Sequence, residues 1–288
     1  MDTCKFEDIV DLRDNQKLIP LFTLNSLLMP GEKMLMRVFE PRYKQMLDDV
    51  VIDDLCYGHV MSNPAMTMLN GWSTPFDIGT LVKVGEMEEQ GTNILYDAIG
   101  RERFRIISLI EPSLPPEDFG SIFPSVSELE ENYLEEDPHG KLYSRALIEI
   151  LPPLRGEVGL KKWENLLILW EHYIKQIIDL TGMNEEIKLH IGDMKEIFSN
   201  PVEESVWALA SMIIDTQEGQ VSCLKAEFAK EIDDFTKNSI FIAHNVNFDY
   251  RVLKEEFKRI GLNFKRKSLC TIELSKSVFP DEKSYSLG

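Results

Sequence analysis

The chain has 288 residues, of which 43% are hydrophobic, and a formal net charge of −18. This length is enough for two domains at roughly 100–200 residues each, and the composition excludes a mostly disordered chain. The start, Met1–Asp8, lacks the basic and apolar regions of a signal peptide, and no apolar run reaches the roughly 18 residues of a membrane span. We therefore expect a cytoplasmic protein with no membrane partner.

The charge is distributed unevenly along the chain. Residues 225–288 contain 12 basic and 10 acidic side chains, a net of +2, whereas the preceding residues contain 19 and 39, a net of −20. Phosphate binding needs cations that displace counterions, so the acidic part would repel nucleic acid. We expect nucleic acid to be a partner through the C-terminal segment if at all.

The cysteine pattern favours free thiols. The cysteines Cys4, Cys56, Cys223 and Cys270 are far apart and form no C-x-x-C pair. A reducing compartment fits this pattern better than a disulfide framework or a zinc site.

Residues 18–111 have the alternation typical of strands. Pro20, near the start of the first strand, suggests a sheet edge. Gly91 predicts a hairpin turn, and Phe104 and Ile106 are predicted to point inward. The expected strands are 18–24, 34–40, 55–61, 79–87, 94–99 and 101–110, with a turn at 29–32, a helix beginning at Pro41 and a loop over 62–78.

After the proline-rich stretch 112–124 the spacing of apolar residues becomes helical. Asn200-Pro201-Val202-Glu203 has the pattern of a helix start, with Asn200 as the N-cap. The expected helices are 125–136, 141–150, 160–180, one that begins at Asn200, and 220–235.

Four spans of this part resemble the Lon N-terminal substrate-binding domain: IPLFTLNSLLMPGE (19–32), RVFEPRYKQML (37–47), GTLVKV (79–84) and AIGRERFRI (98–106). The resemblance covers residues 18–222 and implies an α+β protein. A curled, mostly antiparallel β domain would span 18–115 and a helical bundle 116–222, after an N-terminal extension over 1–17. Such a domain binds a polypeptide substrate or protein partner, performs no chemistry and needs no cofactor.

Two groups of residues in this part have alternative interpretations. The charged residues of the strand and turn patterns favour structural ion pairs and solvated strand faces over ligand binding; they are Arg37, Glu40, Arg42, Arg101 and Arg103. Trp72, in the loop, is a candidate protein contact, and burial beneath the loop is the alternative.

A phosphate-binding G-x-x-x-x-G-K-[ST] loop is absent from the sequence, so no ATPase or protease activity is expected.

The segment SIFIAHNVNFDY (239–250) is the strongest chemical signature. Ile240–Ala243 has the length and β-branched content of a buried strand, and Asp249 follows at the head of a helical pattern. A carboxylate just beyond a buried strand lies where open α/β sheets place their ligands. The segment therefore indicates a candidate metal or nucleotide site.

Residues 225–288 resemble the middle of a DEDD-type 3′–5′ exonuclease in the spans 241–253, 256–261, 269–271, 278–280 and 284–288. The resemblance implies an incomplete ribonuclease H-like α/β fragment over 223–288. It implies that Asp249 is a catalytic metal carboxylate and that His244, Asn245 and Phe248 shape the nucleotide site. Mg²⁺ or Mn²⁺ would be the cofactor of a completed site.

The exonuclease pattern is incomplete in this sequence. Two-metal hydrolysis needs several carboxylates, and no aspartate of the chain has a glutamate two residues later. The last motif of that family is expected beyond residue 288. We therefore expect a binding protein rather than an enzyme, with a fused or truncated reading frame near 220–226. The alternatives are an active exonuclease and a C-terminal segment that is a passive remnant.

Overall fold

The computed structural model describes residues 2–9, 11–120, 122–181, 198–214, 216–228, 240–243 and 267–270. The chain divides into two compact units, residues 1–230 and 231–288. The domain boundaries at 18, 116 and 223 stay a prediction. No helix of the described ranges is long and apolar enough to cross a membrane.

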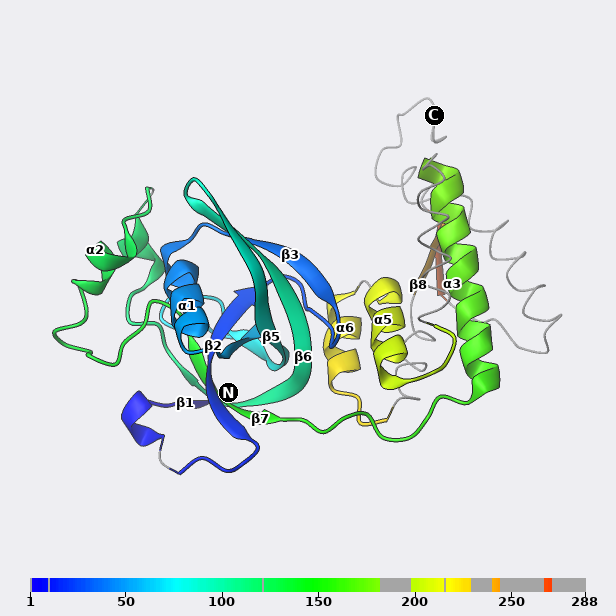
Figure 1. Ribbon diagram of the computed structural model, residues 1–288, viewed down its shortest axis with the longest axis horizontal. Coiled ribbons are helices and arrows are strands. Elements are labelled where there is room, and N and C mark those ends of the chain that lie inside the picture. The colour runs from blue at the N-terminus through cyan, green and yellow to red at the C-terminus, as the bar shows by residue number, and fades with distance from the viewer. Residues whose placement is uncertain are drawn as a thin grey trace. The chain divides into compact units, whose positions relative to one another are not determined.

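The first unit is an α+β structure built on one sheet (Figure 1). Its strands are β1 (Asp2–Thr3), β2 (Gln16–Leu24), β3 (Lys33–Val38), β4 (Cys56–Ser62), β5 (Pro75–Gln90), β6 (Asn93–Ile110) and β7 (Arg145–Ile150). The α-helices of its described residues are α1 (Pro41–Ile52), α2 (Val126–Glu130), α3 (Leu160–Thr181), α5 (Glu203–Ile213) and α6 (Gln217–Leu224), and the 3-10 helices there are Phe6–Asp8 and Pro116–Phe119.

The sheet closes on itself. Its neighbours run β6-β5-β4-β2-β7, and β7 pairs again with β6, so five strands form a ring. The pairings are antiparallel except β2 with β4 and β1 with β6. The predicted β5–β6 hairpin is confirmed, with Gly91 in the turn at a φ of 62°. This closure gives the curled β domain that the sequence predicted.

The prediction of an edge strand at Pro20 was wrong. β2 pairs with β7 on one side and β4 on the other. The Leu21 amide donates to Ser144 of the β7 side, so by alternation the Pro20 nitrogen faces the β4 side. The β4 ladder begins only at Leu21, and the missing N–H of proline therefore costs no ladder bond.

Phe104 fills the barrel where two strands have glycine. It lies directly opposite Gly79 and is fully buried. A Cβ at Gly58 or at Gly79 would stand 2.6 Å from the Phe104 ring, closer than packed atoms allow. The inward predictions for Phe104 and Ile106 are confirmed, since both are buried in the barrel core.

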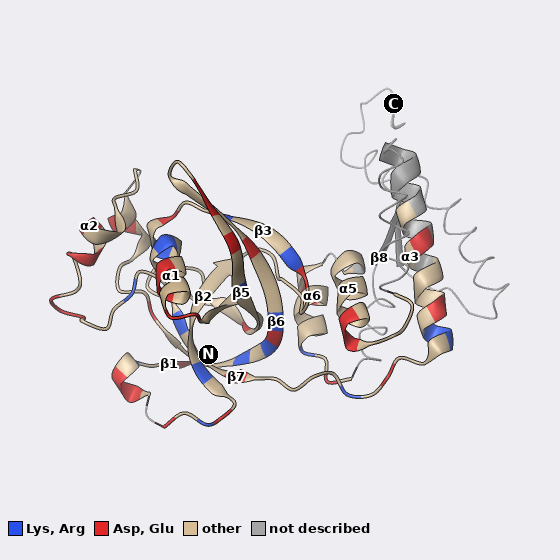
Figure 2. Cartoon of the chain, viewed as in Figure 1, with Lys and Arg blue, Asp and Glu red and all other residues tan. Residues whose placement is uncertain are grey.

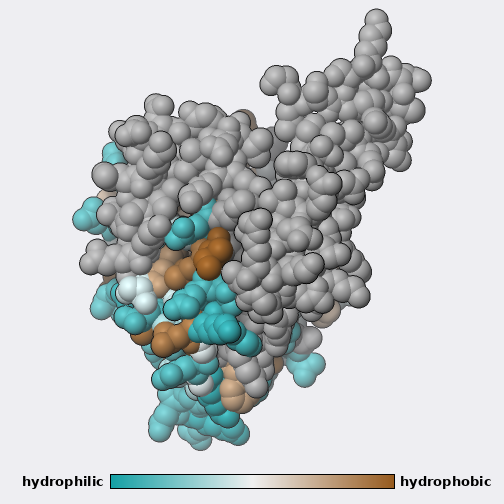
Figure 3. All heavy atoms as spheres, turned by 90° about the vertical axis from the view of Figure 1, so that its right-hand side faces the viewer, coloured by the Kyte–Doolittle hydropathy of each residue, from teal (hydrophilic) through white to brown (hydrophobic). Residues whose placement is uncertain are grey.

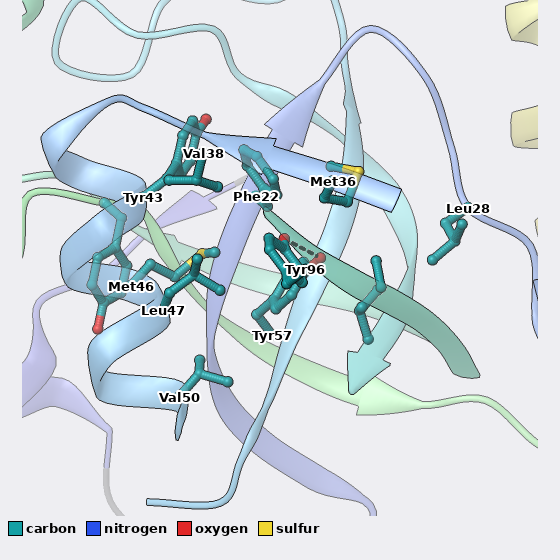
Figure 4. Packing of buried hydrophobic residues seen from close by; sticks show 13 residues of the cluster. Phe22, Leu28, Met36, Val38, Tyr43, Met46, Leu47, Val50, Tyr57 and Tyr96 are labelled. Carbon is teal, nitrogen blue, oxygen red and sulfur yellow. Dashed lines mark hydrogen bonds between the residues drawn. The ribbon is translucent and has the colours of Figure 1, made fainter. Parts of the chain in front are cut away.

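A second core lies between α1 and the outside of the sheet (Figure 4). Met46, Leu47 and Val50 of α1 are buried there, and the Tyr57 and Tyr96 hydroxyls share a hydrogen bond of 2.7 Å. Pro41 occupies the first position of α1, as predicted, because its missing N–H would have no helical partner there. This core fixes the helix that borders the candidate site.

The helix predicted over 141–150 is wrong, because Arg145–Ile150 is β7. Ala146 and Ile148 alternate into the barrel core, and the open sides of β2 and β6 both offer backbone partners. The apolar spacing was compatible with either structure, and this tertiary pairing decides it. The predicted loop 62–78 also ends early, since β5 begins at Pro75.

The helices after β7 begin and end close to their predicted places, with two differences. α5 starts at Glu203 with Val202 as N-cap, not with Asn200. The Glu203 carboxylate instead accepts from the Leu154 amide and the Trp207 indole, both at 3.1 Å, which ties α5 to the chain leaving the barrel. α6 ends at Leu224, so the helix predicted over 220–235 is shorter, and residues 229–235 lie outside the described ranges.

Arg103 joins the barrel to α6. Its buried guanidinium donates to the carbonyls of Leu224, Ala226 and Pro152 at 2.6–2.8 Å. Its Cζ lies 5.0 Å from the centre of the Trp207 ring of α5. One guanidinium therefore satisfies the backbone carbonyls at the C-terminal end of α6 and the carbonyl of Pro152, just after β7.

The second unit is described at two strands, β8 (Ile240–Ala243) and β9 (Lys267–Cys270), which pair in parallel. The strand predicted at Ile240–Ala243 is confirmed.

Replacement of Arg103 with methionine should strongly destabilise the first unit. Three carbonyls would lose their donor, which costs roughly 2–4 kcal/mol in the free energy of unfolding. Denaturant unfolding followed by tryptophan fluorescence measures the change. Arg101→Met is the matched control, since Arg101 is exposed on the same strand, and it should change stability by less than about 0.5 kcal/mol. Equal effects of the two variants would contradict this role.

Stability should also fall as the pH is lowered from about 6.5 to about 4. Burial lowers the pKa of His59 from 6.5 to about 4, so in this window the unfolded chain binds a proton that the folded chain does not. The full difference corresponds to roughly 3 kcal/mol. Unfolding free energies at several pH values should show a shallower slope in His59→Asn than in the parent. An unchanged slope in this variant would contradict the role of His59.

Candidate polypeptide-binding groove

A groove of about 810 Å³ lies at the junction of β3, α1 and the loop that leads into α2. One wall is formed by the end of β3 and the start of α1, the other by the loop, and the β5–β6 turn contributes the remainder. The lining residues are Arg37, Phe39, Pro41, Lys44, Thr92, Asn93, Phe123, Pro124, Ser125 and Val126. The described residues thus bring together segments that are separate in the sequence.

Two partly exposed phenylalanines stack against each other in the lining of this groove. Phe39 and Phe123 are each 45% exposed, and their ring centres are 6.2 Å apart with an interplanar angle of 28°. Such exposure of two large rings at one place is costly in water, since apolar area is best buried. Paired, exposed aromatic side chains in a concave site are typical of contact surfaces.

The groove has two cations and no carboxylate among its lining residues. Arg37 lies over the Phe39 ring with its Cζ 5.6 Å from the ring centre. Neither Arg37 nor Lys44 forms an ion pair with a carboxylate of the described residues. In Figure 2, basic residues mark the start of α1, acidic residues lie along part of β5, and β6 has residues of both signs. The groove is therefore locally basic in an acidic protein.

Trp72 supports the loop that forms the second wall. Its indole donates to the Leu114 carbonyl at 2.9 Å, and its ring meets Phe119 edge-on with centres 5.2 Å apart. It packs on the core cluster formed by Leu114, Phe119, Leu129, Tyr133 and Leu142, as does Val126 of the groove wall. Trp72 is thus partly buried, and it does not line the groove.

Arg42 connects the Trp72 region to α1. Its guanidinium lies 3.8 Å from the Trp72 ring centre and 4.2 Å from that of Tyr43, and it pairs with Glu40 at 2.8 Å. These contacts hold the start of α1 against the loop.

The loop ends at a helix cap. The Ser125 hydroxyl accepts from the Glu128 amide, and the Glu128 carboxylate accepts from the Ser125 amide at 2.8 Å. These hydrogen bonds lower the pKa of Glu128. The helix predicted to start at Ser125 is confirmed at its start, although α2 ends at Glu130 rather than at 136.

The predicted site residues fall into two groups. His244, Asn245, Phe248 and Asp249 lie outside the described residues, so their roles stay predictions. The structural interpretation of Arg42 and Arg103 agrees with their contacts, whereas Arg37 lines the groove. A direct protein contact by Trp72 stays a prediction.

Sequence reasoning missed Phe39, Lys44 and Phe123. The signal that could have found Phe123 is the apolar run Ile122-Phe123 within a proline-rich loop, where apolar residues lack a strand or helix to bury them. Ile122 is 88% exposed.

Among the described residues no three His, Cys, Asp or Glu side chains lie close enough to hold a metal ion. Cys4, Cys56 and Cys223 are free thiols, which agrees with the cysteine pattern.

Comparison with solved structures gives the fold of the chain. A Lon N-terminal domain protein from Xanthomonas campestris superposes with a TM-score of 0.50 at 15% identity, covering 76% of this chain and 95% of that one. The chain has a Lon N-terminal domain-like fold. This likeness concerns the fold alone.

The C-terminal part resembles exonucleases. A family model described as "Exonuclease" matches residues 170–288. Proteins named 3'-5' exonuclease DinG from Staphylococcus haemolyticus and Staphylococcus aureus USA300 are 44% and 42% identical over 63 residues, which is 22% of this chain. The matched segment spans 7% of the length of these relatives.

The family match begins upstream of residue 225, where the sequence resemblance was placed. Residue 170 lies inside α3, and the matched range includes α5 and α6. These two helices contact the Lon-like barrel through Arg103. The two resemblances therefore overlap in the helical part of the first unit.

Trp72→Phe should lower the free energy of unfolding, because Trp72 supports the loop and does not line the groove. The variant loses the hydrogen bond to Leu114 and part of the stacking with Arg42, together roughly 1–2 kcal/mol. Ile122→Ser is the comparison variant, because the Ile122 side chain is 88% exposed and should contribute less than about 0.5 kcal/mol. Thermal unfolding should separate the two variants, and a larger loss for Ile122→Ser would contradict the supporting role of Trp72.

Proposed function

We propose that this protein binds polypeptides through the groove lined by Phe39 and Phe123, without ATPase or protease activity of its own. The observation that carries the proposal is the pair of exposed, facing rings in a concave site on a Lon-like fold. Apolar side chains of an unfolded or extended segment would gain the contacts that these rings lack.

The groove suits a polypeptide better than nucleic acid. The part of the chain before residue 225 has a net charge of −20, which disfavours phosphate backbones. The face in Figure 3 shows small apolar patches separated by hydrophilic groups among the described residues, whereas the groove joins its apolar groups with two cations. The free thiols fit a reducing compartment, which supports a cytoplasmic location for the proposed activity.

The exonuclease resemblance motivates a second candidate function, metal-dependent 3′–5′ hydrolysis. The donor set of this chain does not fit the metal pair of that reaction. Asp249 is one carboxylate, and no D-x-E pair exists among the 288 residues to supply the first-strand ligands. We therefore propose that the exonuclease-like segment is inactive in this chain, and that it would contact nucleic acid only through its own residues.

The proposed binding is tested with the full chain and a permanently unfolded protein, such as fluorescently labelled, reduced and carboxymethylated lactalbumin. Fluorescence anisotropy should show saturable binding, weakened at least about fivefold by Phe123→Ser, since burial of a large apolar side chain stabilises a complex by roughly 1–3 kcal/mol. Leu160→Ser, at an exposed residue of α3, should bind as the parent does. Absence of binding by a folded sample would contradict the proposal.

The same sample is tested for release of nucleotides from a 3′-labelled oligonucleotide with Mg²⁺ or Mn²⁺. We expect none. Metal-dependent release that is abolished by Asp249→Asn would support the second candidate instead.

A further inference from the structure

We infer that the groove selects segments in which an aromatic or large aliphatic side chain is flanked by carboxylates. This inference rests on the proposed function and specifies the class of polypeptide that the groove would take.

The apolar part of the recognised segment follows from the rings. Phe39 and Phe123 leave nearly half of their surface exposed at a ring-centre separation of 6.2 Å. Neighbouring Pro124 and Val126 extend the same apolar wall. A side chain that lies against both rings buries apolar area on two sides, which a small or polar residue would not do.

The acidic part follows from Arg37 and Lys44. Both line the groove, and the other polar lining residues are uncharged: Thr92, Asn93 and Ser125. Arg37 keeps its guanidinium donors free of any hydrogen bond or ion pair to the described residues while it lies over Phe39. A carboxylate beside the bound apolar side chain would meet these donors at short range.

Acidic groups close to the groove limit this preference. Glu40, between the lining residues Phe39 and Pro41, pairs with Arg42, and Glu128 is engaged by Ser125. Asp48 lies one turn after Lys44 on α1, where it faces solvent on one side and interacts electrostatically with Lys44. The pKa of Asp48 is raised by its partial desolvation and by the negative charges of Asp49, Glu89 and Glu130. Asp48 therefore competes with a bound carboxylate for Lys44.

The protein's net charge opposes an acidic segment at long range. At physiological salt the Debye length is about 8 Å, so charges outside the groove are largely screened. Short-range contacts with Arg37 and Lys44 then decide the preference, and the net charge affects mainly the rate of association.

The test uses the full chain and three labelled peptides with one core, Gly-Phe-Gly-Leu, flanked by Asp and Glu, by Ser and Asn, or by Lys and Arg. Anisotropy at physiological salt should give an acidic-over-neutral preference of about tenfold, the effect of two partly exposed ion pairs and their hydrogen bonds. The preference should shrink in 1 M NaCl. Asp48→Asn should increase the affinity for the acidic peptide alone.

Charge reversal identifies the groove. R37E/K44E should reverse the preference, so that the basic peptide binds more tightly than the acidic one. K17E/R101E makes the same change in net charge at two exposed residues outside the groove and should preserve the acidic preference. Phe39→Ser should weaken all three peptides. Circular dichroism and thermal unfolding confirm that each variant is folded.

Four results would overturn the inference, and they separate it from the proposed function. If the three peptides bind with equal affinity and Phe39→Ser abolishes this binding, the proposed polypeptide binding is supported and the preference for acidic segments is contradicted. No binding of any peptide or of unfolded lactalbumin would remove both. Binding of a single-stranded oligonucleotide that is lost in R37E/K44E, with no peptide binding, would assign the groove to nucleic acid. Dimerisation of the parent that R37E/K44E abolishes would assign it to a second copy of the chain.

Discussion

The first unit depends on two consecutive residues of β6 that are buried on opposite faces. Phe104 points into the barrel, where only glycine at positions 58 and 79 leaves room for its ring. Arg103 points outward and donates to carbonyls at and just after the end of α6 and after β7. A strand alternates its side chains between faces, so a shift of register by one residue would place the cation in the barrel and the ring outside. Barrel closure and helix docking are therefore one constraint.

The groove is a consequence of this scaffold and not a separate element. β3 is held by β6 through the pairing of Lys33–Val38 with Ile94–Ile99, and the α1 core fixes the turn at Phe39 that follows it. The opposite wall is held by Trp72, which links two loops with one hydrogen bond and two ring contacts. Since each wall is anchored by a different core, the two phenylalanines can remain exposed without loss of either core.

Much of the β domain could be predicted from local patterns, because alternation, Pro41 at a helix start and Gly91 in a hairpin turn are local chemistry. The helix prediction for 141–150 was wrong because the apolar spacing of this segment suits a helix as well as a strand. Pairing with the open sides of β2 and β6 makes it a strand. The predicted N-cap of α5, Asn200, was wrong for a similar reason: the Glu203 carboxylate accepts from the Leu154 amide, a partner distant in sequence. The groove residues could not be predicted, since their exposure depends on which loops meet.

The sequence by itself determined the acidic character of the chain, its β-then-helical order, the exonuclease-like segment, and the absence of a D-x-E carboxylate pair, because each of these is composition or a contiguous pattern. The tertiary structure decided which polar residues are structural and which face solvent. Arg37 and Arg103 are alike in the sequence, and one lines a groove while the other is buried beneath α6. That difference arises from strand pairing between residues far apart in the chain, which no local pattern encodes.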